Sequence, residues 1–261
     1  MTPLVRPILK WAGGKRQLLP ELRRFYPDRF RTYFEPFLGS GAVFLDLHNA
    51  GLLDAHDVRL SDINADIIGC YSAVRDSVER VITELRILEA GSRAGGPAFF
   101  YDVRDARFNP ERRRLRAGGD PAKYGAGLAA MLIFLNRTGY NGLFRVNGRG
   151  DFNVPAGDQR KPRICDEGNL RRWSEALQRP RVSLVVAGFE TALSDAAGDD
   201  FVYLDPPYAP ASGTARFTAY TAGGFGNSEQ ARLQQIVLDL AWRGAHILLS
   251  NSAVPAVRGS S

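Results

Sequence analysis

The chain has 261 residues, 44% of them hydrophobic and 24% charged, which is typical of a soluble globular protein with one large domain or one domain carrying an insertion. Its longest apolar stretches, such as residues 131–135, are far too short to cross a membrane, and residues 1–12 hold no apolar core of signal-peptide length. Two cysteines make no disulfide framework, and three scattered histidines argue against a zinc site. We therefore expect a cytoplasmic protein with no metal and no membrane partner.

The net charge of +6 is distributed unevenly along the chain. Residues 101–163 hold 13 Lys/Arg and 6 Asp/Glu, a net of +7, whereas the remaining 21 basic and 22 acidic residues nearly cancel. A basic segment beside a neutral body is typical of a protein that binds a polyanion such as nucleic acid. A solvated arginine-rich face would give the same charge, so charge alone leaves both interpretations open.

The first third of the chain predicts alternating strands and helices. A β-prone run at 32–37 leads into a glycine turn at 39–41, and a helix is expected at 42–49. A second strand at 58–60 ends at Asp62, and Asn64 can cap the helix that follows. The apolar residues of this long helix recur at three- and four-residue spacing: Ile67, Tyr71, Val74, Val78, Ile82 and Leu85.

Glycine, proline and arginine become more frequent from about residue 91. A helix is expected at about 123–136, followed by a hairpin at 140–152 with Asn-Gly turn chemistry. The alternation then resumes with a helix around Trp173, strands at 182–186 and 201–204, a helix between Ser228 and Gly244, and a last strand at 247–249. This order predicts an α/β fold, a Rossmann-like and mostly parallel sheet with helices on both faces, with the basic block inserted between the second and third strands.

The glycine turn Gly39-Ser40-Gly41 lies between a predicted strand and a predicted helix. In this arrangement the backbone comes close to a nucleotide-type ligand. Asp62 ends the next strand, 21 residues after Gly41, where an acid can hold ribose hydroxyls. Phe44 occupies the place of the third glycine of a dinucleotide fingerprint, so a ligand with ribose but no pyrophosphate fits better. A plain tight turn is the alternative.

The N-terminal segment at 10–15, Lys-Trp-Ala-Gly-Gly-Lys, superficially resembles a phosphate-binding loop. That interpretation fails because Leu9 stands where the first glycine should be and Arg16 replaces the Mg²⁺-binding Ser/Thr. Lys15 could instead meet a carboxylate, and Trp11 could stack on a flat or cationic group. Simple packing of the tryptophan is the alternative.

Asp205-Pro206-Pro207-Tyr208 follows a predicted buried strand and is the most specific motif in the chain. It falls at the carboxyl end of that strand, where α/β sheets bind ligands, and its two prolines stiffen the turn and remove two N–H donors. Asp205 and the Pro206 carbonyl can accept the two N–H bonds of an exocyclic amine, while Tyr208 stacks on the base. Such acceptors would draw the amine towards tetrahedral geometry, in line with a sulfonium methyl. An ordinary proline turn is the alternative.

Together these motifs make the chain resemble the Dam-type DNA adenine-N6 methyltransferases over residues 8–252. The resemblance rests on four blocks that follow the order of the family: residues 9–15, residues 34–41 with 60–64, residues 135–155 and residues 201–208. It implies methyl transfer from S-adenosylmethionine to the N6 amine of adenine in a short duplex DNA site, GATC being the commonest target of the family. The adenine must be flipped, because N6 cannot reach a sulfonium inside the duplex.

The resemblance also implies roles for individual residues. Base capture falls to Asp205, Pro206 and Tyr208. Cofactor binding falls to Trp11, Lys15, Phe37, Gly39, Gly41, Asp62 and Asp205. DNA contacts fall to Lys10, Tyr140, Asn141, Leu143, Arg145 and Pro155. The implied domains are a discontinuous catalytic domain, 1–66 with 164–261, and a DNA target-recognition insertion at 67–163.

The sequence departs from the family pattern after residues 250–252, where other members continue with further strands and a basic tail. This departure predicts an exposed sheet edge at 247–249, through which chains could associate, although a monomer is expected. It also leaves open an inactive or truncated DNA-binding remnant. Methylation of cytosine N4 or of a protein amide on the same scaffold is a further alternative, whereas Phe44 and the basic insertion make a nicotinamide oxidoreductase remote.

Overall fold

A computed structural model describes residues 3–11, 13, 15–118, 123–158, 162–207 and 225–250. Its elements run in the order η1 (Lys15–Gln17), α1 (Leu19–Leu22), η2 (Arg23–Phe25), β1 (Thr32–Glu35), α2 (Ala42–Asn49), β2 (Asp57–Asp62), α3 (Ala65–Tyr101), η3 (Asp102–Phe108), α4 (Asn109–Gly118), α5 (Ala126–Thr138), η5 (Tyr140–Gly142), α6 (Glu167–Leu177), β3 (Val182–Val186), α7 (Phe189–Ala192), β4 (Phe201–Leu204), α8 (Asn227–Trp242) and β5 (His246–Leu249).

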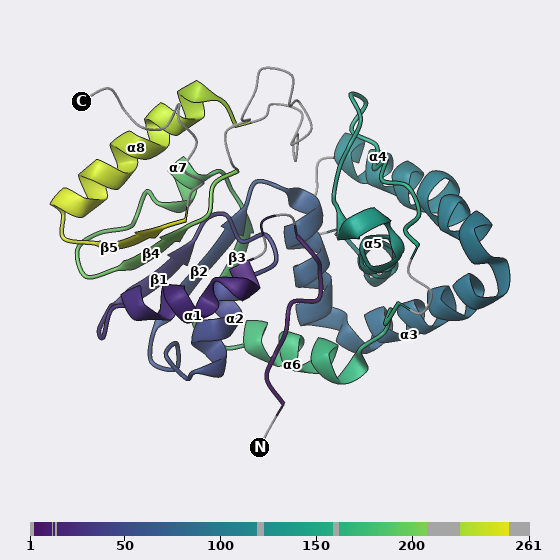
Figure 1. The fold of residues 1–261 in the computed structure, drawn as a ribbon, viewed down its shortest axis with the longest axis horizontal. Helices are drawn as coiled ribbons and strands as arrows, with labels where there is room; N and C mark the ends of the chain where they lie inside the picture. The colour runs from purple at the N-terminus through teal and green to yellow at the C-terminus, as the bar shows by residue number, and fades with distance from the viewer. Residues whose placement is uncertain are drawn as a thin grey trace.

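The five strands form one sheet in the order β3-β2-β1-β4-β5, and every pairing in it is parallel. The chain builds outward from β1 through β2 to β3, then returns to add β4 and β5 on the other side of β1 (Figure 1). The predicted Rossmann-like parallel sheet is therefore confirmed. Among the described strands β5 and β3 lie at the two edges of the sheet.

Alternate side chains of the central strands face two separate apolar clusters. Tyr33 and Tyr203 belong to the larger cluster, which is shared with α2, α3, α5 and α6. Phe34 and Val202 belong to the smaller cluster, which packs under α7 and α8. Because successive strand residues point to opposite faces, this division gives the sheet helices on both faces.

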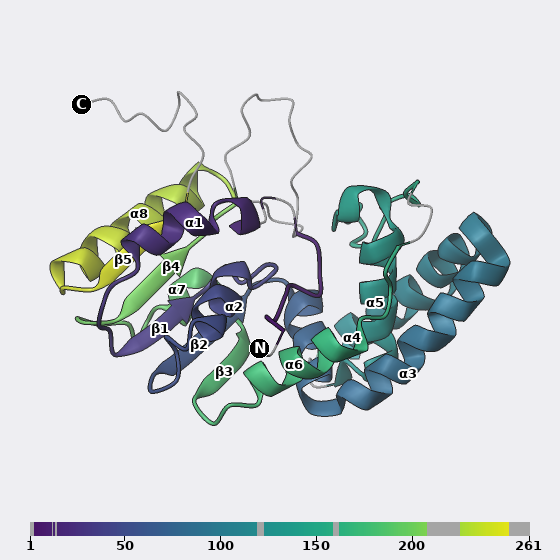
Figure 2. The same ribbon diagram turned by 60° about the horizontal axis from the view of Figure 1, so that its bottom comes forward.

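The segment between β2 and β3 is mostly helical and extends to one side of the sheet, with α3 and α5 packed together (Figures 1 and 2). The helix α3 begins at the predicted cap, since the Asn64 side chain accepts a hydrogen bond from the Asp66 backbone N–H at 3.0 Å. It continues beyond the apolar pattern that ends at Leu85, with a break at Gly96. After this break the Phe99 ring packs against Gly91, where a β-carbon would lie only 2.3 Å from Phe99 Cζ.

The predicted hairpin at 140–152 differs from the structure, which has two isolated antiparallel bridges in this region and no continuous ladder. The bridges join Gly139 to Ala156 and Val146 to Phe152. Of the two Asn-Gly pairs, Asn141-Gly142 forms the short turn η5 at the start of the segment, and Asn147-Gly148 lies at the hairpin tip, as the predicted turn chemistry requires. Side chains of α4 hold the returning arm and take the place of the missing ladder bonds. Residues 139–156 are called the recognition segment below.

None of the helices in the described part of the chain is both long and apolar enough to cross a membrane.

Candidate active site

The carboxyl ends of β1 and β4 lie side by side where the sheet changes direction. The connection after β1 leads towards β2, whereas β4 and β5 extend the other way. In open α/β sheets ligands bind outside the strand ends at such a switch point. The glycine turn follows β1 and Asp205 follows β4, so the two motifs singled out in the sequence meet at the expected place.

The glycine turn is fixed by Asp62 from the end of β2. The Asp62 carboxylate accepts the backbone N–H of Gly39 at 3.0 Å and that of Asn64 at 2.8 Å. The Tyr71 hydroxyl donates to the Gly39 carbonyl at 2.8 Å. Burial raises the pKa of Asp62 to about 6, although its two backbone hydrogen bonds oppose that rise.

Trp11 lies directly on Gly39. The Gly39 φ of +47° is left-handed, and a β-carbon there would come within 2.9 Å of Trp11 Cδ1. Glycine is therefore required both by the backbone conformation and by the indole ring. Gly41 packs instead against Trp173, with Cη2 only 3.0 Å from the position of a β-carbon. Phe37 is half-buried and stacks on Phe189 of α7, with ring centroids 5.6 Å apart.

An ion pair between a buried lysine and a partly buried aspartate joins the N-terminal segment to the end of β4. Lys15 Nζ lies 2.6 Å from Asp205 Oδ1, and the lysine side chain is 3% exposed. The same Nζ donates to the Gly13 carbonyl at 2.8 Å. Burial raises the pKa of Asp205, and the charge and hydrogen bond of Lys15 oppose the rise. Pro206 and Pro207 follow directly, and Tyr208 lies outside the described residues.

Glu35, the last residue of β1, is a third buried acid near the site. Its carboxylate accepts a hydrogen bond from the Tyr33 hydroxyl at 2.7 Å and one from the Phe44 backbone N–H at 3.0 Å. Gly41, the N-cap of α2, has no side chain to cap the helix, so Glu35 accepts one of its free N–H groups instead. Burial raises the pKa of Glu35 to about 8. The charges of Asp205 and Asp62 add to the rise, and the two hydrogen bonds oppose it.

The sequence interpretation assigned no role to Glu35. The available signal was an acid ending a buried strand directly before the glycine turn. The charges of Asp62 and Asp205 both raise the pKa of Glu35, so these two predicted site residues lie close to the same buried acid.

Three asparagines hold the N-terminal segment in place, and the sequence interpretation missed them. Asn49 pairs with the backbone N–H and C=O of Val5, both at 2.9 Å, and Asn169 pairs with those of Arg6 at 2.9 and 2.8 Å. Asn136 of α5 does the same for Lys10, accepting its N–H at 2.7 Å and donating to its C=O at 2.9 Å. These amides come from three helices, and together they fix the backbone that carries Trp11 and Lys15.

The predicted DNA-contacting residues lie on the recognition segment and beside it. Asn136 also donates to the Gly142 carbonyl at 2.9 Å, and a β-carbon on Gly142 would meet Lys10 Cδ at 2.3 Å, so Lys10 lies against the η5 turn. Tyr140 is half exposed, and its backbone N–H donates to the Pro155 carbonyl at 2.9 Å. Of the remaining three residues, Asn141 is exposed, and Leu143 and Arg145 are partly buried.

The structure thus forms three groups from the predicted residues. Trp11, Gly39 and Asp62 meet at the glycine turn, Lys15 meets Asp205, and Lys10 meets the recognition segment. Arg145 donates through Nε to the Asn153 Oδ1 at 2.9 Å, within the segment itself. The arrangement offers a glycine backbone, an aromatic ring and two buried carboxylates at one strand edge, beside a segment that can contact a large ligand.

Comparison with known proteins gives one consistent family. The family model of the D12 class N6 adenine-specific DNA methyltransferases matches residues 11–260. The type II methyltransferase M1.LlaDCHI of Lactococcus lactis subsp. cremoris is 35% identical over 251 residues, covering 96% of this chain and 82% of the relative. The type II methyltransferase M.MjaIII of Methanocaldococcus jannaschii is 39% identical over 257 residues, covering 95% and 84%. The DNA adenine methylase of Escherichia coli K12 is 36% identical over 249 residues, covering 94% and 80%.

Proposed function

We propose that Asp205 and Pro206 receive the target amine beside a cofactor site at the glycine turn. The chain belongs to the D12 class of N6 adenine-specific DNA methyltransferases. As a member of this family, the chain transfers a methyl group from S-adenosylmethionine to the N6 amine of adenine in DNA. The assignment of residues to steps is our proposal. The ion pair of the buried Lys15 with Asp205, at the switch point of the sheet, carries it.

The residues that would hold S-adenosylmethionine are Trp11, Lys15, Phe37, Gly39, Gly41, Asp62 and Asp205. The Asp62 carboxylate can accept hydroxyl groups of a ribose in addition to its backbone bonds, because each carboxylate oxygen has more than one acceptor position. Asn64 supports the fit, because its buried Nδ2 has no hydrogen-bond partner among the described residues. A buried donor without a partner costs free energy, and an acceptor atom of a bound ligand would supply the missing hydrogen bond. When bound, the cofactor supplies an electrophilic methyl group on a sulfonium.

Asp205 and Pro206 act on the other reactant. The adenine amine is a poor nucleophile because its lone pair is delocalised into the ring, and two acceptors can hold its N–H bonds in a reactive orientation. The ion pair with Lys15 engages Oδ1 and fixes the carboxylate, which carries a second oxygen able to accept an N–H. The carbonyl of Pro206 is the second acceptor. Tyr208 is assigned to stacking on the base from the sequence motif alone.

The DNA side of the proposal falls to Lys10 and the recognition segment, with Tyr140, Asn141, Leu143, Arg145 and Pro155 as contacts. An Arg side chain matches the edge of guanine in the major groove, which suits a short site such as GATC. We divide the chain into a catalytic part, 1–66 with 164–261, and a target-recognition part, 67–163. We further propose a cytoplasmic monomer, with association through the β5 edge as the alternative.

The variant Asp205→Ala tests the acceptor assignment. It should abolish methyl transfer while duplex binding survives, because the basic segment that contacts phosphates is intact. Transfer is measured in single-turnover assays with a labelled cofactor, and DNA binding by fluorescence anisotropy. Asp195→Ala, at an exposed acid, is the matched control and should behave like the parent. A loss of less than about tenfold in Asp205→Ala, ~1.4 kcal/mol, would contradict a central role.

A further inference from the structure

Arg112 of α4 is a buried arginine with all of its side-chain nitrogens engaged inside the protein. It is 4% exposed. Its Nε donates to Asp66 Oδ1 at 2.8 Å and its Nη2 to Asp66 Oδ2 at 2.6 Å, a bidentate pair. Its Nη1 donates to the Gly150 carbonyl at 2.8 Å. Burial separates this arginine from its neighbours. Arg113, which pairs with Asp151 of the recognition segment, has a side chain that is 59% exposed, and Arg114, which pairs with Glu111 of the same helix, has one that is 79% exposed.

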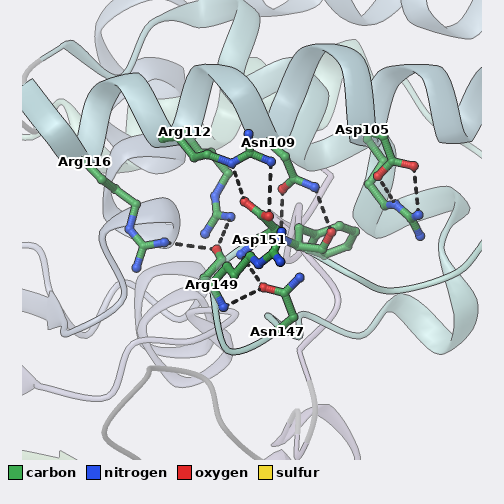
Figure 3. A network of polar contacts seen from close by, with 11 residues as sticks. Asp105, Asn109, Arg112, Arg116, Asn147, Arg149 and Asp151 are labelled. Carbon is green, nitrogen blue, oxygen red and sulfur yellow. Dashed lines mark hydrogen bonds and ion pairs between the residues drawn. The ribbon is translucent and has the colours of Figure 1, made fainter.

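On one side Arg112 holds the tip of the recognition segment. Arg116 donates to the same Gly150 carbonyl at 3.0 Å, so two guanidinium groups share one acceptor (Figure 3). The Gly150 φ of +80° is left-handed, a conformation that favours glycine, and a β-carbon there would displace the Arg116 guanidinium, whose Nη1 would lie 2.1 Å away. Asn109 pairs with the backbone of Phe152 in both directions, at 3.0 and 2.8 Å. Between Gly150 and Phe152, Arg113 pairs with the Asp151 carboxylate, so the returning arm is fixed to α4 at three successive residues.

On the other side Arg112 reaches the proposed cofactor site. Its partner Asp66 lies in the first turn of α3, where its backbone N–H is capped by Asn64. The Asn64 backbone N–H donates in turn to Asp62, the acid that clamps Gly39. A continuous chain of hydrogen bonds thus runs from the glycine turn through Asp66 and Arg112 to Gly150.

A second path of ring contacts joins the same two regions. The Arg112 guanidinium lies 5.8 Å from the centroid of the Phe144 ring, and Phe144 lies 5.5 Å from Trp11. Trp11 in turn packs on Gly39. Arg112 is the residue common to both paths, so its position depends on both the glycine turn and the recognition segment.

We propose that Arg112 and Asp66 are positioning residues that set the recognition segment relative to the methyl-transfer site, so that a correctly read DNA site places its adenine at Asp205. This inference rests on the proposed DNA contacts of the recognition segment. Because Arg112 is 4% exposed and its side-chain nitrogens are engaged inside the protein, we assign it no contact with DNA or cofactor. It acts by fixing the Gly150 carbonyl and the Asp66 end of α3 to one guanidinium plane, whose fork geometry a lysine cannot reproduce.

The test separates positioning from stability. Removing one partner of a buried ion pair leaves an uncompensated charge, whereas replacing both partners with apolar residues is often neutral for stability. The double variant Arg112→Met with Asp66→Leu should therefore unfold close to the parent temperature. Arg112→Lys is a second variant, which keeps a positive charge opposite Asp66 but loses the bond to Gly150.

The decisive readout is discrimination, the ratio of kcat/KM on the preferred site to kcat/KM on a site with one base pair changed. We expect both variants to bind S-adenosylmethionine as the parent does, and their discrimination to fall about tenfold, within the range that one bidentate base contact supplies. Arg114→Met is the matched control on the exposed face of α4, since its partner Glu111 lies on the same helix and not on the recognition segment. It should weaken binding to all sequences alike and leave discrimination unchanged.

Parent-like discrimination in folded Arg112→Lys and in the folded double variant would overturn the proposal and leave the pair a purely structural role. Arg145→Ala is measured in parallel to separate this result from failure of the DNA-contact proposal. If Arg145→Ala lowers discrimination and the Arg112 variants do not, only the positioning role is wrong. If none of them changes it, the recognition segment does not read the site.

Discussion

Burial of Glu35 should make this enzyme less stable as the pH rises, whereas a carboxylate held in an ion pair makes a protein less stable as the pH falls. Folding raises the pKa of its carboxyl from 4.5 to about 8, chiefly through burial. The folded chain thus holds the proton more tightly than the unfolded chain. The stability contributed by protonated Glu35 is fully present below pH 4.5 and is lost as the pH rises to 8.

The magnitude follows from the same values. Each pH unit between the two pKa values costs up to about 1.4 kcal/mol, so the loss from pH 4.5 to 8 is at most about 5 kcal/mol. That is a large part of the ~5–15 kcal/mol that stabilises a typical domain. Glu35→Gln removes the titration, and its amide oxygen can still accept the bonds from Tyr33 and Phe44. We expect this variant to be less sensitive to pH than the parent over the interval and to exceed it in stability at pH 8.

Urea unfolding at half-unit steps from pH 5 to 8.5 measures the difference between parent and variant at each pH. Glu79→Gln is a suitable control, since the hydrogen bond from Arg171 lowers the pKa of Glu79, and its loss acts in the opposite direction. Parallel curves for the parent and Glu35→Gln would refute the reasoning, because they would show that Glu35 is ionised in the folded enzyme throughout this range.

Three further predictions concern ligand binding. Gly39→Ala should weaken S-adenosylmethionine binding about tenfold by calorimetry, since a left-handed alanine costs ~1–2 kcal/mol and Trp11 must also move. Gly127→Ala, where a β-carbon meets nothing within 4 Å, should bind like the parent, and equal affinities for the two variants would contradict the assigned turn. Arg145→Ala should cost about 1–3 kcal/mol at the preferred site and relax specificity at one base pair, whereas uniform weakening would make Arg145 a phosphate contact. DNA affinity should fall steeply between 50 and 200 mM salt, by roughly a thousandfold if six phosphates are neutralised, and a flat salt profile would separate the basic segment from DNA binding.

Elements with local signals were predicted well from the sequence. The helix at 42–49 and the strands at 182–186 and 201–204 have the predicted bounds, because apolar runs bounded by turn residues define them without reference to the rest of the fold. The glycine turn and Asp62 were also predicted to meet, since the carboxyl ends of neighbouring parallel strands share one edge of the sheet.

Features that depend on distant side chains were not predicted. A hairpin was expected at 140–152, but no pattern indicated that Asn109 and Arg112 bind its backbone from a helix some 40 residues away in the chain. Similarly, Asn169 holds Arg6 across 163 residues. An asparagine on a helix has no sequence pattern that reveals such a partner, and Glu35 shows its role only once α2 folds back over it.

Modification-aware sequencing of DNA from a methylation-free host that expresses this chain tests the central claim most directly. We predict N6-methyladenine at a single short sequence, and none in the same host expressing Asp205→Ala. Methylation of cytosine N4, or an adenine signal that persists unchanged in Asp205→Ala, would contradict the account of how this site selects and holds its base.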